Sequence, residues 1–438
     1  MKLTTASPLL ERSLQADAMQ ALLTPIVRAA YAAELASVDV PRVMPRSTGE
    51  ILIQYHLSYA ERSRESLTPP VLFGEFFPDG APDQPNSPER LPDTVWLEHL
   101  PLRLWLYPHD PQLRYLHLIC DPKQFHSVYE STLENVGYGR ERMGTPATIL
   151  GYRLGRRCVA QVQWMPGDSA PVKTPSKGNI VVKMCRTRQA LPLWTRMRQL
   201  AHEGFAEKSS DGISIPKGLF LHQETGALFQ RYEAGESLHD LIDTEAFVRG
   251  CGLAGRTLQK LHATRLLGLP LYSANDELTH LEWLVSVTTR FYPGLEVGLR
   301  AALSDVQSGS VRVENPPMAT SHRDFYDKQL LYSETRAVLL DCDTLSLADP
   351  ALDYGNFLAH LQWRMHQSPG DSGRLQRGAE AFQSQYPIPD AEFAARAAWW
   401  TSSALLRLAC LYLWRPRWRS SVPALMRSRR FQRRVAVI

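Results

Sequence analysis

Apolar and polar residues alternate in two early stretches of the chain. The stretch EILIQYHLSY alternates over Ile51–Tyr59, and LRLWLY alternates at 102–107. A period of two is typical of a β-strand with one buried face. Residues 8–36 are rich in Ala and Leu and favour helix, whereas the Pro-, Asp- and Asn-rich residues 78–93 favour a long loop. We therefore predict a strand-bearing, cap-like α/β region over residues 1–135.

Five short apolar runs follow this region. TILGYRL and CVAQVQW predict a tight hairpin with its turn at Gly155, and NIVVKMC predicts a third strand with Lys183 near its centre. A helical pattern begins at Pro192 and stops at Gly204, a residue type that favours helix C-termini. GLFLH and ALFQRY, joined by QETG, predict two more strands. Residues 136–233 are therefore expected to form a strand-rich lobe.

The periodicity changes to that of helices after this point. Apolar residues recur at intervals of four and three from Phe247 to Leu261, which predicts an amphipathic helix. Within the helical remainder, LLYS and AVLLDCD predict one small isolated hairpin. Residues 234–438 are therefore expected to form a mainly helical lobe, and the fold class is predicted as α+β with two lobes and an extra N-terminal region.

The composition is that of an ordinary globular protein. The 438 residues are 44% hydrophobic and 21% charged, and no window reaches the 18 apolar residues that a membrane span needs. The first residues lack the apolar core of a signal peptide, so a cytoplasmic location is expected. The six cysteines are scattered without paired spacing, which argues against a zinc or disulfide framework.

Positive charge is concentrated near the end of the chain. Residues 361–438 hold thirteen Arg, no Lys and four acidic residues, whereas the formal charge of the whole chain is only +4. Such a segment with interleaved Trp and Phe can contact nucleic acid or another anionic surface. The simpler interpretation is a solvated final helix, so nucleic acid is not expected as a partner.

Polar residues stand at the ends of two buried strands in SHRDFYDKQLLYSETRAVLLDCDT, residues 321–344. Phosphoryl transfer needs this kind of arrangement, because its catalysis consists mostly of positioning and neutralising phosphate charge. It needs a Gly-containing hairpin, a nearby Lys, a carboxylate for the acceptor hydroxyl, and oxygen ligands for Mg²⁺. These parts occur in the required order as Gly155, Lys183, Asp324, Gln329 and Asp341.

The same residues carry a family resemblance. HRDFYDKQLL resembles the H-x-D-x-x-x-x-N catalytic loop of the aminoglycoside phosphotransferase and choline kinase family, and LLDCDTLSLADPALDYGNFLAHL resembles the metal loop that follows it. AGRTLQKLHA and LFQRYEAGESL are similar to the helix before the catalytic loop and to the hinge between lobes. The resemblance covers roughly residues 145–415. It implies a bilobal, protein-kinase-like fold, with ATP and Mg²⁺ as cofactors.

The resemblance implies roles for the residues of the catalytic and metal loops. Asp324 would accept or orient the acceptor hydroxyl, and Asp341 would bind the metal. Gln329 replaces the family's metal-binding Asn, as in maltokinase-type sugar kinases, and still offers an amide oxygen. His322 would hold the catalytic loop, and Asp353 would bind the backbone of that loop from the next helix.

Nucleotide contacts are implied for the strand-rich lobe. Lys183 would contact the α and β phosphates, and the backbone from Gln230 to Tyr232 would meet the adenine. At the hairpin, Gly155 and Arg156 would approach the phosphates. A solvated turn with the sequence Gly-Arg-Arg is the alternative interpretation of these residues.

Three acidic or basic residues keep alternative interpretations. Glu203, at the very end of the predicted helix, is the nearest acidic candidate to pair with Lys183. Asp343 is either a second metal ligand or a polar strand end. His262 ends an apolar helical stripe and is better explained as a core histidine than as a catalytic one.

The predicted function is ATP- and Mg²⁺-dependent phosphorylation of a hydroxyl on a small molecule, a sugar or amino sugar in first place. A polycationic acceptor would bind best to an acidic surface of the helical lobe. Because the terminal segment of that lobe is basic, a neutral or anionic acceptor is favoured. One alternative is a peptide Ser/Thr kinase in a biosynthetic pathway, and another is a nucleotide-binding pseudokinase scaffold. The sequence leaves the oligomeric state open.

Overall fold

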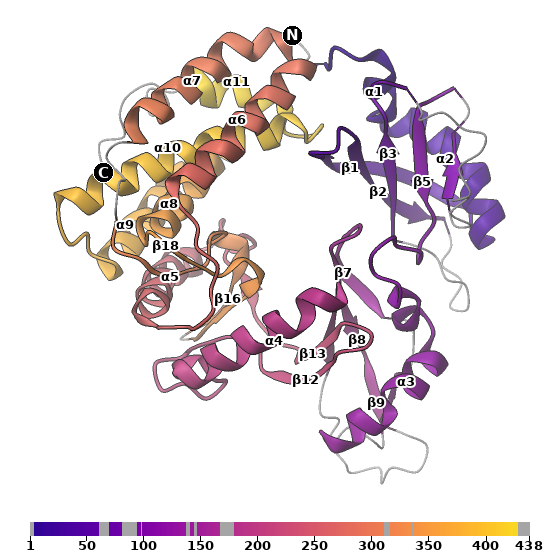
Figure 1. Cartoon of the computed structure of the whole chain (residues 1–438), viewed down its shortest axis with the longest axis horizontal. Coiled ribbons are helices and arrows are strands. Elements are labelled where there is room, and N and C mark those ends of the chain that lie inside the picture. Colours follow the sequence, from indigo (N-terminus) through magenta and orange to yellow (C-terminus); the bar gives the residue numbers. More distant parts are fainter. Residues whose placement is uncertain are drawn as a thin grey trace.

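The computed structural model describes residues 4–60, 70–80, 94–97, 99–136, 141–143, 147–166, 179–310, 316–334 and 336–427. Most of the loop predicted at 78–93 and the last part of the Arg-rich segment lie outside these ranges. Three parts of the chain are arranged around a common centre: an N-terminal region, a strand-rich lobe and a helical lobe (Figure 1).

The N-terminal region is built on one antiparallel five-stranded sheet with the order β1-β2-β3-β5-β4. Its elements are α1 (Pro8–Ser13), α2 (Ala16–Tyr31), β1 (Leu35–Pro45), β2 (Ile51–Tyr59), β3 (Val71–Phe76), β4 (Thr94–Trp96), β5 (Leu102–Trp105) and α3 (Pro122–Asn135). The strand predicted at 51–59 is confirmed, and the strand predicted at 102–107 is present as β5 but ends at Trp105. The helix predicted to residue 36 ends at Tyr31, and β1, β3 and β4 were not predicted.

Two irregularities explain why β1 escaped prediction. Its pairing with β2 shifts register between Leu35 and Ser37 and again between Asp39 and Arg42. Each shift breaks the alternation of buried and exposed residues on which the prediction depends. The first five residues of β2 are buried on both faces, whereas His56 and Ser58 are exposed. Tyr55 is buried and donates its hydroxyl to Ser13 O at 3.0 Å.

The strand-rich lobe holds a second antiparallel sheet with the order β12-β13-β10-β8-β7. Its elements are β6 (Glu141–Met143), β7 (Thr148–Arg153), β8 (Arg157–Val162), β9 (Trp164–Pro166), β10 (Ile180–Cys185), α4 (Thr187–Leu200), β12 (Gly218–His222) and β13 (Ala227–Arg231). All five predicted strands are present. The predicted start of the helix was too late, because α4 already begins at Thr187 and contains Pro192.

The helical lobe contains most of the helices. They are α5 (Ala246–Ala263), α6 (Ala274–Phe291), α7 (Glu296–Gly309), α8 (Ala351–Gln367), α9 (Ser372–Gln385), α10 (Ala391–Leu413) and α11 (Val422–Arg427). The strands are β11 (Ile213–Ser214), β14 (Glu236–Ser237), β15 (Ala319–Ser321), β16 (Leu330–Ser333), β17 (Arg336–Leu339) and β18 (Ser346–Ala348). The hairpin β16–β17 is not isolated as predicted: β11 and β14 extend it to four strands. Those two-residue strands are too short to leave a periodic signal.

The N-terminal region contacts both lobes. Tyr129 in α3 donates its hydroxyl to Thr225 of the strand-rich lobe at 3.0 Å. On the other side, Ala6 N donates to Phe291 O at 2.8 Å, and Glu11 is ion-paired with Arg419 at 2.9 Å. The N-terminal region therefore bridges the strand-rich lobe and the helical lobe (Figure 1).

The architecture confirms the predicted α+β fold with a strand-rich and a helical lobe. Among the described residues, no helix combines the length and the apolarity that crossing a bilayer requires.

Candidate active site

The catalytic loop is held by a buried carboxylate on α8. Asp353 is fully buried and accepts hydrogen bonds from the backbone N–H groups of His322 at 2.6 Å and Arg323 at 2.7 Å. Arg323 has a φ of +68°, in the left-handed region that is unfavourable for residues with a Cβ. Asp353 Oδ2, which accepts from the N–H of His322, also lies 3.2 Å from His262 Nε2. Asp353 thus makes the backbone contact expected of it, and His262 lies behind the loop in the core.

His322 joins the catalytic loop to the segment of residues 341–344 that follows β17, here called the acidic loop. Its Nε2 lies 2.9 Å from Leu340 O, and its own carbonyl accepts a hydrogen bond from Thr344 Oγ1 at 2.8 Å. The ring is fully buried. These contacts fix the two loops to each other, which is the structural role expected for His322.

Asp324 extends from this fixed loop into a large cavity. Gln329 Nε2 lies 3.4 Å from Asp324 Oδ2, so the two residues predicted for catalysis and metal binding are neighbours. Burial raises the pKa of Asp324 above its ordinary value, and the nearby charge of Asp341 raises it further. A carboxylate with a raised pKa is a better proton acceptor than an exposed one.

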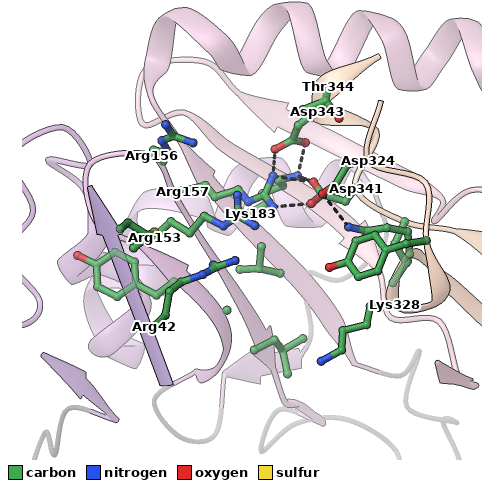
Figure 2. Close-up of a pocket in the computed structure, with 18 of the residues that line it drawn as sticks. Arg42, Arg153, Arg156, Arg157, Lys183, Asp324, Lys328, Asp341, Asp343 and Thr344 are labelled. Carbon is green, nitrogen blue, oxygen red and sulfur yellow. Dashed lines mark hydrogen bonds and ion pairs between the residues drawn. The ribbon is translucent and has the colours of Figure 1, made fainter. Parts of the chain in front are cut away.

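Two carboxylates of the acidic loop share the same cations (Figure 2). Lys183 Nζ lies 3.4 Å from Asp341 Oδ1 and also contacts Asp343. Arg157 from β8 donates to Asp341 Oδ1 at 2.6 Å and to Asp343. Asp341 has a φ of +57°, so the chain accepts backbone strain to aim this side chain. Burial alone would raise the pKa of Asp341, but Lys183 and Arg157 hold it well below its ordinary value.

Lys183 therefore has its acidic partners in the helical lobe. Glu203, the candidate from the sequence, lies after α4 in a π-turn and contacts His202 at 3.5 Å. Asp343 is a partner of Lys183, beyond being a strand end. Arg157 was missed because its position beside Gly155 favours a solvated turn. No signal in a single sequence reveals a contact between β8 and a loop so far along the chain.

The hairpin turn is attached to the N-terminal region. Gly155 has a φ of +66°, which the turn requires, and its N–H donates to Asp110 Oδ2 at 2.8 Å. Tyr152 donates its hydroxyl to the same oxygen at 2.9 Å. Gly155 is not among the residues that line the cavity, so its N–H does not face the expected phosphates. Arg156 and Arg157 do line the cavity.

The predicted hinge residues lie at the end of β13. Gln230 and Tyr232 both line the cavity. Gln230 is paired on both sides, with Val181 and Gly218, and its amide nitrogen lies 3.2 Å from Met197 Sδ. The backbone N–H of Tyr232 donates to Asn179 O at 3.1 Å. The structure therefore places the predicted hinge residues at the cavity. The backbone of Gln230 is already paired with two strands, and the N–H of Tyr232 is already bonded to Asn179 O.

All three parts of the molecule line this cavity, whose volume is about 1290 Å³. Residues of the N-terminal region form one wall: Pro41, Arg42, Val43, Met44, Pro45, Arg46, Leu52, Gln54, His56, Pro70 and Val71. The N-terminal region was predicted as cap-like, but the residues of this wall were not predicted, because the segment VPRVMP carries no motif and belongs to an irregular strand. The six predicted residues other than Gly155 and Arg156 also line the cavity: Lys183, Gln230, Tyr232, Asp324, Gln329 and Asp341.

Several solved structures are similar to this chain. A choline/ethanolamine kinase family protein from Mesorhizobium loti is 17% identical, with 72% of this chain and 98% of that chain covered and a TM-score of 0.48. The ethanolamine kinase of Plasmodium vivax is 12% identical, with 66% and 84% covered and a TM-score of 0.46. An aminoglycoside phosphotransferase from Streptomyces rimosus is 14% identical, with 64% and 98% covered and a TM-score of 0.39. A sequence comparison with curated proteins gives no match.

The family comparison covers the residues of the site. The model of the phosphotransferase enzyme family matches residues 172–397, which is more than half of the chain and includes Lys183, Asp324 and Asp341. The N-terminal region lies outside this match. The chain therefore belongs to the phosphotransferase enzyme family.

Proposed function

We propose that this enzyme transfers the γ-phosphoryl group of Mg·ATP to a hydroxyl of a small polar molecule, a sugar in first place. The observation that carries the proposal is that Asp324, on a loop fixed by Asp353, opens into the same cavity as Lys183, Asp341 and Asp343. This arrangement places a proton acceptor beside a cluster of groups suited to polyphosphate and metal.

The nucleotide end of the site lies between the two lobes. Lys183 and Arg157 are ion-paired with the carboxylates of the acidic loop and are suited to the phosphates, while the segment from Gln230 to Tyr232 borders the adenine end. The proposed ligands of Mg²⁺ are Asp341, Gln329 and, as an additional one, Asp343.

The residues present fit a magnesium ion. Asp341 and Asp343 both contact Lys183 and Arg157, so oxygens of both carboxylates already face the same two cations. Carboxylate and amide oxygens are the hard ligands that Mg²⁺ prefers. When bound, the ion would neutralise phosphate charge.

Asp324 is proposed as the acceptor of the hydroxyl proton. As the acceptor oxygen forms its bond to the γ-phosphorus, the bond from that phosphorus to the β,γ-bridging oxygen breaks and ADP leaves. The proton of the hydroxyl passes to Asp324, whose raised pKa favours this transfer.

A small acceptor is favoured over a peptide by the wall that the N-terminal region contributes. This wall limits the room beside Asp324, and it contains Arg42 and Arg46 instead of acidic residues. A polycationic amino sugar would find no acidic surface there. We therefore place neutral or acidic sugars and polyols before amino sugars.

The test is ADP formation from Mg·ATP with pools of sugars, sugar acids, amino sugars and amino alcohols. The Asp324→Asn variant is measured in parallel, with Asp243→Asn as the control, because Asp243 is an exposed acid of the same lobe. We expect one pool to stimulate ADP formation, Asp324→Asn to lower the rate by about 10²–10⁴-fold, and Asp243→Asn to have no effect. Undiminished turnover in Asp324→Asn would refute its role, and no stimulation by any pool would refute a small-molecule acceptor.

A further inference from the structure

The cations that line the cavity fall into two groups. One group is ion-paired with carboxylates: Arg46 with Glu75, Arg157 and Lys183 with the acidic loop, Arg231 with Glu207, Arg364 with Asp327, and Arg407 with Glu277. The other group has no ion-paired carboxylate within the part of the chain that the structure describes. It consists of Arg42, Arg153, Arg156, Arg323, Lys328 and Arg415, of which Arg323 stacks over the ring of Tyr272 at 3.6 Å.

The second group comes from all three parts of the molecule. Arg42 lies on β1, Arg153 at the end of β7, and Arg415 just after α10. Arg415 stacks over the ring of Tyr412 at 4.2 Å. In Figure 2, Arg42 and Lys328 approach the open part of the cavity from opposite sides. Both lie away from the contacts that join Lys183 and Arg157 to the acidic loop.

Arg42 is the centre of this group. Burial, together with the like charges of Arg153 and Arg415, lowers the pKa of Arg42 to about 10. Arg42 lines the same cavity as Arg153, Arg415 and the proposed catalytic carboxylate of Asp324, whose negative charge acts on the pKa of Arg42 in the opposite direction. Arg42 therefore stands on the acceptor side of the cavity.

Like charges gathered in a half-buried site repel one another and lose hydration, so the empty cluster is unfavourable. An anionic ligand would remove this cost, because guanidinium groups bind carboxylate and phosphate with charge-assisted hydrogen bonds. The nucleotide phosphates do not require the cluster, since Lys183, Arg157 and a metal at the acidic loop already serve them in the proposed site.

We propose that Arg42, Arg153 and Arg415 form an anion subsite, in which a carboxylate or phosphate group of the acceptor binds while its hydroxyl faces Asp324. That the bound anion is part of the phosphate acceptor rests on the proposed function. The inference then restricts the acceptor to hydroxyl compounds that carry a negative charge. The N-terminal region then supplies a residue that determines specificity, through Arg42.

The test measures anion binding separately from turnover. Inorganic phosphate, D-gluconate and glucose are titrated by calorimetry into the native enzyme and the variants, with and without the saturating Mg complex of a non-hydrolysable ATP analogue that fills the γ-phosphate position. The variant is Arg42→Gln. Arg12→Gln is the control, because it removes the same charge from the exposed surface of α1 in the same region. Arg42→Lys keeps the positive charge but removes the planar guanidinium, and it therefore tests whether anion binding depends on the charge or on the shape of the side chain.

We expect phosphate or gluconate to bind in preference to glucose, and Arg42→Gln to weaken that binding at least about tenfold, because a charge-assisted hydrogen bond is lost. Arg12→Gln should bind as the native enzyme does, and Arg42→Lys should recover part of the loss. Preference for phosphate points to a phosphorylated acceptor, and preference for gluconate to a carboxylated one.

Three results would overturn the subsite: no preference for either anion over glucose, equal anion binding in Arg42→Gln and native enzyme, or an equal loss of analogue and anion binding in Arg42→Gln. The last result would assign Arg42 to the nucleotide. Failure of the proposed function looks different, because it appears as absent analogue binding or absent acceptor-dependent ADP formation in the native enzyme, while the anion titrations without analogue still report on the subsite.

Discussion

Asp110 of the N-terminal region accepts a hydrogen bond from the backbone N–H of Gly155 at 2.8 Å, at the turn of the first hairpin of the strand-rich lobe. The other oxygen of the same carboxylate accepts from the backbone of the next turn, Gln112 N at 2.7 Å and Leu113 N at 2.8 Å. A single buried carboxylate thus fixes the hairpin to the region that forms the third wall of the cavity. The hairpin is therefore held by protein contacts and not only by a nucleotide.

We predict that Asp110→Ala lowers the free energy of unfolding by about 2–4 kcal/mol, because several buried donors lose their acceptor at once. Asp39→Ala, at an exposed acid of the same region, should change it by less than about 0.5 kcal/mol. Denaturant unfolding followed by far-UV circular dichroism measures both. Equal stability of the two variants would show that the Asp110 contacts contribute nothing.

The contact between Asp353 and the catalytic loop predicts a kinetic effect. Asp353→Asn keeps one acceptor oxygen but turns an NH₂ group toward a backbone N–H, so either His322 or Arg323 loses its partner. We expect kcat to fall about 10²-fold through misplacement of Asp324, while the Kd of the nucleotide stays within about twofold. Steady-state kinetics and nucleotide titration separate the two quantities. A parallel loss of nucleotide binding would indicate general disruption of the lobe.

Arg157 predicts a competition with metal. In Arg157→Gln, Asp341 and Asp343 lose a shared cation, and the free energy of unfolding in the absence of metal should fall by about 1–3 kcal/mol. Mg²⁺ should then raise the Tm of the variant more than that of the native enzyme, because the ion replaces the missing charge. Arg188→Gln, at an exposed position on α4, serves as the control. Identical Mg²⁺-dependent shifts in all three proteins would contradict this prediction.

His360 predicts a loss of stability in acid. Its ring is buried, stacks on Tyr326 with centroids 4.2 Å apart, and has a pKa well below the ordinary value because of burial and because of Arg364, Arg407 and Arg415, against the opposing charge of Asp327. The unfolded chain therefore binds a proton below about pH 6.5 that the folded state does not bind. Above that pH the ring is neutral in both states, and its titration does not lower the free energy of unfolding. As the pH falls further, this titration lowers the free energy of unfolding by up to about 1.4 kcal/mol per pH unit.

The matching experiment compares His360→Gln with the native enzyme in denaturant unfolding at pH 7.5, 6.5 and 5.5. The variant should lose less stability between pH 6.5 and 5.5, since Gln does not titrate. His117→Gln, at an exposed histidine, should follow the native enzyme. Equal slopes for His360→Gln and native enzyme would exclude His360 as a source of the acid sensitivity.

Local patterns were sufficient for the regular elements of the two lobes. The alternation around Ile53, the apolar runs on both sides of Lys183, and the helical stripe from Phe247 to Leu261 all correspond to elements of the structure. These signals work because burial on one face depends on neighbouring residues in the chain. Where the backbone is irregular, as at the register shift before Arg42, the same signal fails.

The sequence by itself determined the fold class, the family and the position of the catalytic and acidic loops, because each depends on residues closely spaced in the chain. Only the tertiary structure decided which charges meet. It paired Lys183 with Asp343, directed the N–H of Gly155 to Asp110, and brought Arg42 from the N-terminal region into the cavity that Asp324 also lines. Contacts between residues that lie 45 or more positions apart arise from packing and long-range electrostatics, and a single sequence carries no local record of them.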